Sequence, residues 1–177
     1  ATADIGQLKV DAAARRLSAV NPEISIRRLA ARVDGAALLP LVEAADVVLD
    51  CSDNFATRHA VNAACVRAGK PLVSGAAIRF DGQIAVFDIA NPASPCYHCL
   101  FGEGQELEET RCATMGVFAP LVGIIGATQA AEALKLVAGV GDSLAGRLLL
   151  LDTMAMTWRE VRVPRDPACP VCGPGHR

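Results

Sequence analysis

The sequence predicts an α/β protein with a Rossmann-like mixed sheet, in which a parallel β-α-β core is followed by antiparallel C-terminal strands. Residues 46–51 and 72–77 are apolar runs of strand length, typical of strands that are buried on both faces. A helical pattern at 55–68 lies between them. A strand, a helix and a strand in this order form a right-handed crossover. Two further strand-like runs, at 148–151 and 157–163, predict the C-terminal strands.

Two helices and a short strand are predicted ahead of this core. Apolar residues recur at helical spacing over residues 7–20. The alternation of apolar and polar residues at 24–26 then predicts a short strand. A second helix is predicted at 36–45, although Pro40 lies inside the pattern and must shift its start or bend it.

The pattern changes after the crossover. Asp81 and Gly82 form a strong turn signal, and apolar residues flank them at 78–80 and 84–89. This arrangement predicts an antiparallel hairpin with its turn at Asp81 and Gly82.

A long apolar helix is predicted at 121–137. Polar residues such as Gln129 and Glu132 interrupt it too early for a membrane span, so we expect a core helix. Gly123 and Gly126 are expected to let a neighbouring element approach this helix closely.

Two cysteine pairs indicate a metal site. Cys96 and Cys99 form one Cys-x-x-Cys pair, and Cys169 and Cys172 form the other. Two such pairs brought together make a closed tetrahedral site for structural Zn²⁺. The alternatives are a redox dithiol or part of a disulfide framework, and two pairs favour the metal. His98 lies between two of these cysteines and could itself be a ligand, although we expect its side chain to be solvated.

Composition excludes several classes of protein. The chain has 177 residues, of which 52% are hydrophobic, and a net charge of -2. It has no cluster of Lys or Arg residues that would indicate a nucleic acid or an anionic membrane as a partner. Seven cysteines suggest a reducing compartment, and we expect a cytoplasmic protein.

Polar residues follow the predicted strand at 46–51. Asp53 and Asn54 come just beyond its carboxyl end, where open α/β sheets bind ligands. The alternative is that one of them caps the following helix. Cys51 and Cys65 fall within the strand and helix patterns, and we expect both to be small core residues.

Several short motifs in order resemble the MoeB/ThiF/HesA family, whose members are similar to ubiquitin-activating enzymes. Besides the two cysteine pairs, the motifs are Ile5-Gly6-Gln7-Leu8-Lys9-Val10, Asn21-Pro22, Leu49-Asp50-Cys51-Ser52-Asp53-Asn54, Ser74-Gly75-Ala76, Gly82-Gln83 and Ala119-Pro120-Leu121-Val122-Gly123. The resemblance spans nearly the whole chain. It implies ATP-dependent adenylylation of the C-terminal glycine of a ubiquitin-like sulfur-carrier protein, of the MoaD or ThiS kind, for molybdopterin, thiamine or related sulfur transfer.

The resemblance also implies roles for individual residues. Lys9 is similar to the lysine that reaches the ATP phosphates, and Asp53 to the aspartate beside the nucleotide and its Mg²⁺. Asn54 matches a nucleotide-contacting position. Cys112 matches a cysteine that some members link covalently to the activated carrier, and its alternative is an idle thiol. A homodimer is a further implication, which the apolar helix at 121–137 would suit.

The chain departs from the family at one point. Members also carry a strand and a Gly-x-Gly-Gly-x-Gly loop before the Lys9 motif, and residues 1–177 contain neither. We therefore expect the chain to be the C-terminal part of a single adenylating domain, which binds ATP poorly without the loop amides. The competing interpretation is a catalytically silent, zinc-stapled module that binds a ubiquitin-like partner.

Overall fold

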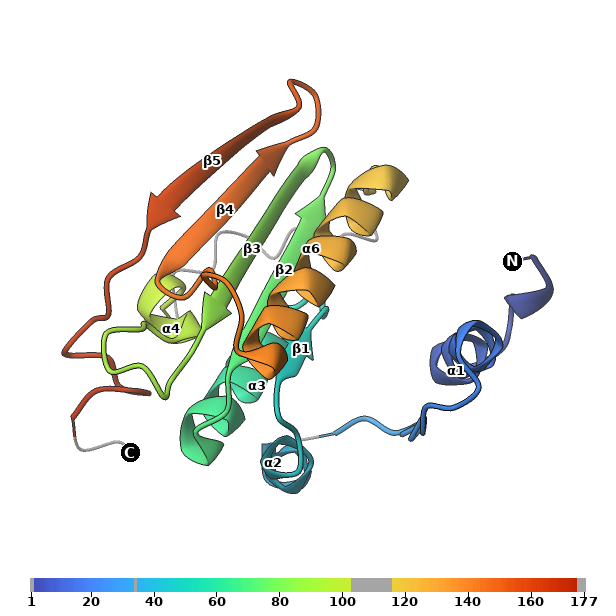
Figure 1. Cartoon of the computed structure of the whole chain (residues 1–177), viewed down its shortest axis with the longest axis horizontal. Helices are drawn as coiled ribbons and strands as arrows, with labels where there is room; N and C mark the ends of the chain where they lie inside the picture. Colours follow the sequence, from blue (N-terminus) through green and yellow to red (C-terminus); the bar gives the residue numbers. More distant parts are fainter. Residues whose placement is uncertain (1, 34, 103–115, 175–177) are drawn as a thin grey trace. The chain divides into compact units, whose positions relative to one another are not determined.

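The computed structural model describes residues 2–33, 35–102 and 116–174. The chain divides into two compact units, residues 1–33 and 34–177, and each is described by itself. Figure 1 follows the chain through the elements of both units. Cys112, a predicted site residue, lies outside the described residues.

The first unit contains a short 3-10 helix, Thr2–Asp4, and the helix α1, Lys9–Val20. The helix predicted at 7–20 is therefore confirmed, with a later start. The strand predicted at 24–26 is wrong, since this segment is irregular. A strand needs a neighbouring strand to bond its backbone groups, and no described segment pairs with residues 24–26.

The second unit is built on a five-stranded sheet with strands in the order β1-β2-β3-β4-β5. Strands β1 and β2 are parallel, and every later pair is antiparallel. The predicted mixed sheet is thus confirmed. The strands are β1 (Val48–Asp50), β2 (Leu72–Ile78), β3 (Asp81–Phe87), β4 (Arg147–Asp152) and β5 (Thr157–Arg162).

Strand β1 is shorter and more open than its sequence predicts. It pairs with β2 from Val48 opposite Leu72 to Asp50 opposite Ser74, and with no other described strand. Leu49 is 41% exposed, so the prediction of a strand buried on both faces is wrong for β1. An apolar run reports only on hydrophobicity, whereas burial also depends on which elements cover the strand.

The predicted hairpin exists, but its turn comes earlier than predicted. Ile78 of β2 pairs with Asp81 of β3, so the turn consists of Arg79 and Phe80. Arg79 takes the positive φ of 50° that the turn requires. Gly82 lies within β3, where a Cβ would stand 2.7 Å from Leu121 Cδ1. Gly82 therefore lets the helix that carries Leu121 approach the sheet closely, and it is not part of the turn.

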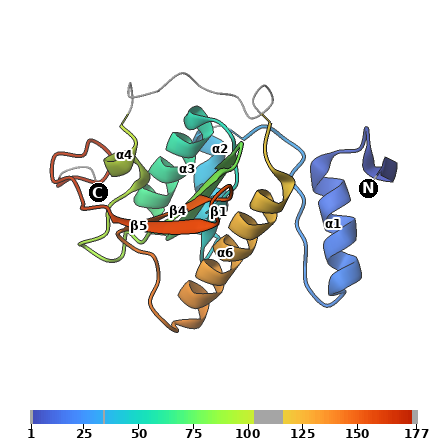
Figure 2. The ribbon, with the colours of Figure 1, turned by 90° about the horizontal axis from the view of Figure 1, so that it is seen from above.

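Helices cover both faces of the sheet (Figure 2). Three lie on one face: α2 (Gly35–Glu43), α3 (Phe55–Ala68) and the short α4 (Tyr97–Leu100). They bury Leu72 and Phe87 of the sheet. Helix α6 (Ala119–Ala138) covers the other face, against Val73 and Ile84 in alternate positions of the same strands. Pro40 is accommodated inside α2.

Helix α6 is long and apolar enough to cross a membrane by length and composition alone. Its buried side chains Leu121, Ile125 and Ala133 pack against the sheet, and Gln129 and Glu132 are buried as well. It is therefore a core helix, as predicted. The expected close approach at its own glycines is wrong, since a Cβ at either Gly123 or Gly126 would meet nothing within 4 Å. The glycines that permit the approach belong to the strands.

Candidate functional site

A pocket of about 620 Å³ opens beyond the carboxyl ends of β1 and β2 in the second unit. The chain following β1 forms one wall, the end of β2 the floor and α6 the opposite wall. Both Asp53 and Asn54 line it, so the structure brings these two predicted residues to one cavity. The other lining residues that bear on its chemistry are Cys51, Ser52, Arg58, Gly75, Tyr97, Phe101 and Gln129.

Asp53 and Asn54 occupy the turn between β1 and α3. Asp53 is exposed at the pocket. Asn54 is the N-cap of α3, and its Oδ1 accepts a hydrogen bond of 2.8 Å from the Thr57 backbone N–H. The capping alternative is thus confirmed for Asn54. Because the cap uses Oδ1, its Nδ2 amide is the group that can donate to a ligand.

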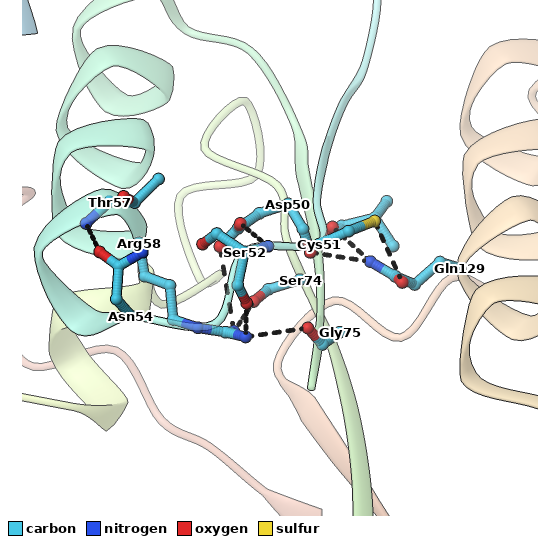
Figure 3. Close-up of polar contacts among 10 residues, drawn as sticks. Asp50, Cys51, Ser52, Asn54, Thr57, Arg58, Ser74, Gly75 and Gln129 are labelled. Atoms are coloured by element: carbon cyan, nitrogen blue, oxygen red, sulfur yellow. Dashed lines mark hydrogen bonds and ion pairs between the residues drawn. The ribbon is translucent and has the colours of Figure 1, made fainter. Parts of the chain in front are cut away.

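A buried arginine ties the segment after β1 to the middle of β2. Arg58 of α3 is 6% exposed and donates to Ser74 Oγ at 3.3 Å, to the Gly75 carbonyl at 3.2 Å and to the Ser52 carbonyl (Figure 3). Its Nη1 also lies 3.9 Å from Oδ2 of Asp50, which is 4% exposed. The guanidinium fork therefore satisfies the Ser52 carbonyl just beyond β1 and the Gly75 carbonyl in the middle of β2.

A glutamine makes the matching contacts from the other face. Gln129 Nε2 donates to the Asp50 carbonyl at 3.0 Å and to the Val73 carbonyl at 3.3 Å. Its Oε1 accepts from Cys51 Sγ at 3.6 Å. The prediction from sequence omitted Arg58 and Gln129. One available signal was a polar residue on the apolar face of a helix, which needs a buried partner.

Cys51 faces the pocket, so the prediction that it is a core residue is wrong. Partial burial raises the pKa of its thiol above the usual range, which keeps the thiol protonated near neutral pH. Cys65 is buried in the core as predicted, and burial raises its pKa to about 12.

Aromatic side chains form the wall beside α4. Tyr97 and Phe101 line the pocket, with ring centroids 4.8 Å apart. The Tyr97 ring also meets His59 edge-on at 5.3 Å. Burial raises the pKa of Tyr97 to about 12, so its phenol stays neutral. His98 is half-buried, which contradicts the expectation of a solvated side chain.

The four predicted cysteines meet in one cluster, next to this aromatic wall. Their Sγ atoms all lie within 4.8 Å of one another. The Sγ–Sγ distance is 3.9 Å for Cys96 and Cys99, 3.7 Å for Cys96 and Cys169, and 3.5 Å for Cys99 and Cys172. Sulfur atoms about 2.3 Å from a tetrahedral metal stand about 3.8 Å apart, whereas a disulfide needs about 2.05 Å. The cluster can therefore hold a metal ion.

Burial disfavours the charged form of Cys96 and Cys172 in this cluster. It raises the pKa of Cys96 far above its usual range and that of Cys172 to about 11. Buried thiolates gathered in one place are unfavourable unless a positive charge stabilises them. Four protein ligands leave a tetrahedral ion no open position, so the site is suited to holding the chain together.

Lys9 is the first residue of α1, in the first unit, and Asp53 belongs to the second. The meeting of Lys9 with Asp53 at one nucleotide therefore stays a prediction. The roles of Asp53 and Asn54 toward a nucleotide also stay predictions.

Comparison with known proteins agrees with this architecture. The chain is 45% identical over 174 residues to the molybdopterin-synthase adenylyltransferase of Escherichia coli, covering 97% of this chain and 68% of that protein. It is 43% identical over 176 residues to the sulfur carrier protein adenylyltransferase of Thermus thermophilus, with 97% and 65% covered.

Solved structures show the same fold at lower identity. Escherichia coli MccB, crystallised with AMPCPP and MccA, superposes with a TM-score of 0.81 at 23% identity, over 98% of this chain and 53% of that one. The chain thus spans about two thirds of the two curated relatives and about half of MccB. The ThiF family matches residues 1–171, and the chain belongs to that family.

Proposed function

We propose that the protein adenylylates the C-terminal glycine of a ubiquitin-like sulfur-carrier protein with ATP, for molybdopterin, thiamine or related sulfur transfer. The observation that carries this proposal is the pocket at the strand ends, with Asp53 at its rim, in a member of the ThiF family. The names of the relatives support it, since they are adenylyltransferases that act on molybdopterin synthase and on sulfur carriers.

The reaction needs a carboxylate to attack the α-phosphorus of ATP, so that the acyl-adenylate forms as pyrophosphate leaves. A hard Mg²⁺ ion takes carboxylate and phosphate oxygens, and it neutralises charge that builds up on the leaving group. Asp53 is an exposed carboxylate that lines the pocket just beyond β1, and it suits this ion. Asn54 supplies an amide donor to the nucleotide, while its oxygen caps α3.

Two residues complete the proposed machinery. Lys9 stabilises the departing phosphates with its ammonium group. Cys112 accepts the activated acyl group: its sulfur forms a thioester with the carrier's terminal carbonyl, and AMP leaves.

The four-cysteine cluster is assigned to structural Zn²⁺, since four thiolates are a typical zinc ligand set. We assign the protein to the cytoplasm, where thiols stay reduced and available to a metal. A homodimer is supported by the apolar side chains that α6 leaves exposed, Val122, Leu134 and Val137. Sedimentation equilibrium of the full-length gene product tests the dimer.

Carrier-dependent exchange of pyrophosphate into ATP tests the function. The full-length gene product is assayed with a MoaD- or ThiS-type carrier, together with the variants Asp53→Asn and Asp142→Asn. Asp142 is an exposed aspartate outside the pocket, so its variant is the matched control. We expect Asp53→Asn to lower the exchange rate by about 100-fold and Asp142→Asn to leave it unchanged.

The competing binding module gives a different result in the same assay. It binds the carrier but exchanges no pyrophosphate at any enzyme concentration. That outcome overturns the adenylylation proposal.

A further inference from the structure

Among the described residues, Gln129 is the polar side chain of α6 that hydrogen-bonds the end of β1. It is 3% exposed, and its amide contacts Asp50, Cys51 and Val73, of which Cys51 lines the pocket. Both donated hydrogen bonds go to backbone carbonyls, one on β1 at Asp50 and one on β2 at Val73. The accepted bond comes from the thiol of Cys51, the first residue beyond β1.

The sheet has a gap that fits this side chain. A Cβ on Gly75 of β2 would lie 2.4 Å from Gln129 Cδ and 2.5 Å from its Oε1. Real Cβ atoms do not come so close to other heavy atoms, so any larger residue at position 75 must displace the amide. Gly75 has an ordinary negative φ in β2, so the glycine is needed for space.

The position of these contacts determines what they control. Strand β1 pairs with β2 over only three residues, and its last one, Asp50, lies three positions before Asp53. A three-residue strand has few ladder bonds to fix its direction. Gln129 bonds the carbonyl of Asp50 and the side chain of Cys51, which places the start of the segment that carries Asp53.

We propose that Gln129, seated over Gly75, is a positioning residue for the nucleotide site: it fixes the end of β1 so that Asp53 is held in place for the metal-bound nucleotide. This inference rests on the proposed function of Asp53. Arg58 bonds the Ser52 carbonyl just beyond β1 and the Gly75 carbonyl of β2, from α3 on the opposite face. The end of β1 is thus held from both faces of the sheet.

The first experiment measures the affinity of the full-length protein for Mg²⁺-ATP by titration calorimetry. Gln129→Leu keeps the approximate volume of the side chain but removes both donors and the acceptor. We expect its dissociation constant for Mg²⁺-ATP to rise about three- to tenfold, the range for losing one or two hydrogen bonds. Thr128→Val is the matched control on α6, since the Thr128 hydroxyl donates within its own helix to the Ile124 carbonyl, outside the pocket.

If Gln129 only stabilised the fold, its substitution would not change the difference between ATP affinity with Mg²⁺ and ATP affinity with EDTA. Wild-type protein should bind ATP more tightly with Mg²⁺ than with EDTA, and Gln129→Leu should lose most of that difference. The double variant Asp53→Asn/Gln129→Leu should lose no more of its affinity for Mg²⁺-ATP than Asp53→Asn alone, because both substitutions act on the same contact.

The space that Gly75 leaves for the Gln129 amide gives a second, independent test. Gly75→Ala alone should weaken Mg²⁺-ATP binding by displacing Gln129. In the Gln129→Ala background the space is open, so adding Gly75→Ala should have no further effect. Melting temperatures of all variants show whether each one is folded at the temperature of the titration.

The outcomes separate the inference from the function on which it rests. If wild-type protein binds no Mg²⁺-ATP, the proposed function fails. If wild-type and Asp53→Asn differ as expected, but folded Gln129→Leu binds Mg²⁺-ATP like wild-type, the positioning role of Gln129 is overturned. Additive losses in the double variant with Asp53→Asn overturn it as well.

Discussion

Arg58 and Asp50 place opposite charges where solvent hardly reaches. The guanidinium is held by two carbonyls and a hydroxyl, while the closest approach to the Asp50 carboxylate is 3.9 Å. The Asp50 Oδ1 atom also accepts from the Ser52 N–H at 2.9 Å. At the residue scale, each partner is thus stabilised by several dipoles as well as by the other charge.

Removal of Arg58 tests this arrangement. In Arg58→Met the Asp50 carboxylate stays buried without a counter-charge, so we expect the free energy of unfolding to fall by about 3–5 kcal/mol. Urea denaturation measures the change. Arg147 forms an exposed ion pair with Glu160 at 2.9 Å, and the control Arg147→Met should cost less than about 1 kcal/mol. Equal effects of the two substitutions would contradict this account.

Cys51 offers a chemical probe of the pocket. Its thiol pKa is raised by burial, so the reactive thiolate is scarce near neutral pH and increases about tenfold per pH unit below the pKa. We expect iodoacetamide labelling of Cys51, followed by peptide mass spectrometry, to be slow at pH 7. The labelling rate should rise about tenfold per pH unit, in proportion to the thiolate.

Nucleotide should protect the same thiol. Mg²⁺-ATP bound in the pocket would cover Cys51, because this residue lines the cavity beside Asp53. Labelling of Cys51 that is unaffected by saturating Mg²⁺-ATP would place the nucleotide elsewhere. The buried Cys65 is the internal control, and it should stay unlabelled with or without nucleotide.

At the element scale, α6 lies close against the sheet because β2 and β3 have glycines beneath it. A Cβ on Gly82 would stand 2.7 Å from Leu121 and 2.8 Å from Ile125, both of which are buried. We expect Gly82→Ala to lower the free energy of unfolding by about 1–3 kcal/mol, the usual cost of overpacking a core.

Gly123→Ala is the matched control for that substitution. The added methyl meets nothing within 4 Å, and alanine favours a helix interior over glycine by about 1 kcal/mol. This variant should therefore be more stable than wild-type in the same denaturation experiment. Destabilisation by Gly123→Ala would mean that the outer face of α6 is covered in the native protein.

Helix α4 connects the metal cluster with the pocket. Cys96 and Cys99 flank Tyr97, which lines the pocket and whose backbone N–H donates to Asn62 Oδ1 at 2.8 Å. We expect Cys99→Ser to lose the metal, measured by elemental mass spectrometry. The free energy of unfolding should fall by about 2–5 kcal/mol, as for loss of a comparable cross-link.

Hydrogen exchange localises the effect of metal loss. Amides of residues 97–101 should exchange faster in Cys99→Ser than in wild-type, since this segment is anchored by the cluster. Cys51→Ser is the control that should retain the metal, because Cys51 is outside the cluster. Full metal content in Cys99→Ser would contradict the assignment of the four thiols to one site.

At the scale of the whole molecule, the cluster joins positions far apart in the chain. Cys96 and Cys99 follow β3, and Cys169 and Cys172 follow β5. The intervening chain includes α6, β4 and β5, so the cluster closes a loop around the antiparallel half of the sheet. Such a closure stabilises the fold mainly by restricting the unfolded chain.

The sequence by itself determined most of the element types, the mixed sheet and the four cysteines that meet in one cluster. These features depend on local signals: hydrophobic period, Gly69 at the end of α3, and two cysteines on one tight turn. Asp53 and Asn54 were also found, because polar residues beyond a strand end lie where such sheets bind ligands.

Only the tertiary structure decided which buried polar groups hold the pocket and how the sheet packs. Gln129 meets Asp50 across 79 positions of sequence, and no local pattern encodes that contact. The hairpin turn lies at Arg79 and Phe80, and Gly82 lies within β3, where it leaves space for Leu121 and Ile125 of α6. Local sequence patterns determine which segments form helices and strands. Packing and hydrogen bonding between residues far apart in the sequence determine what each side chain contacts.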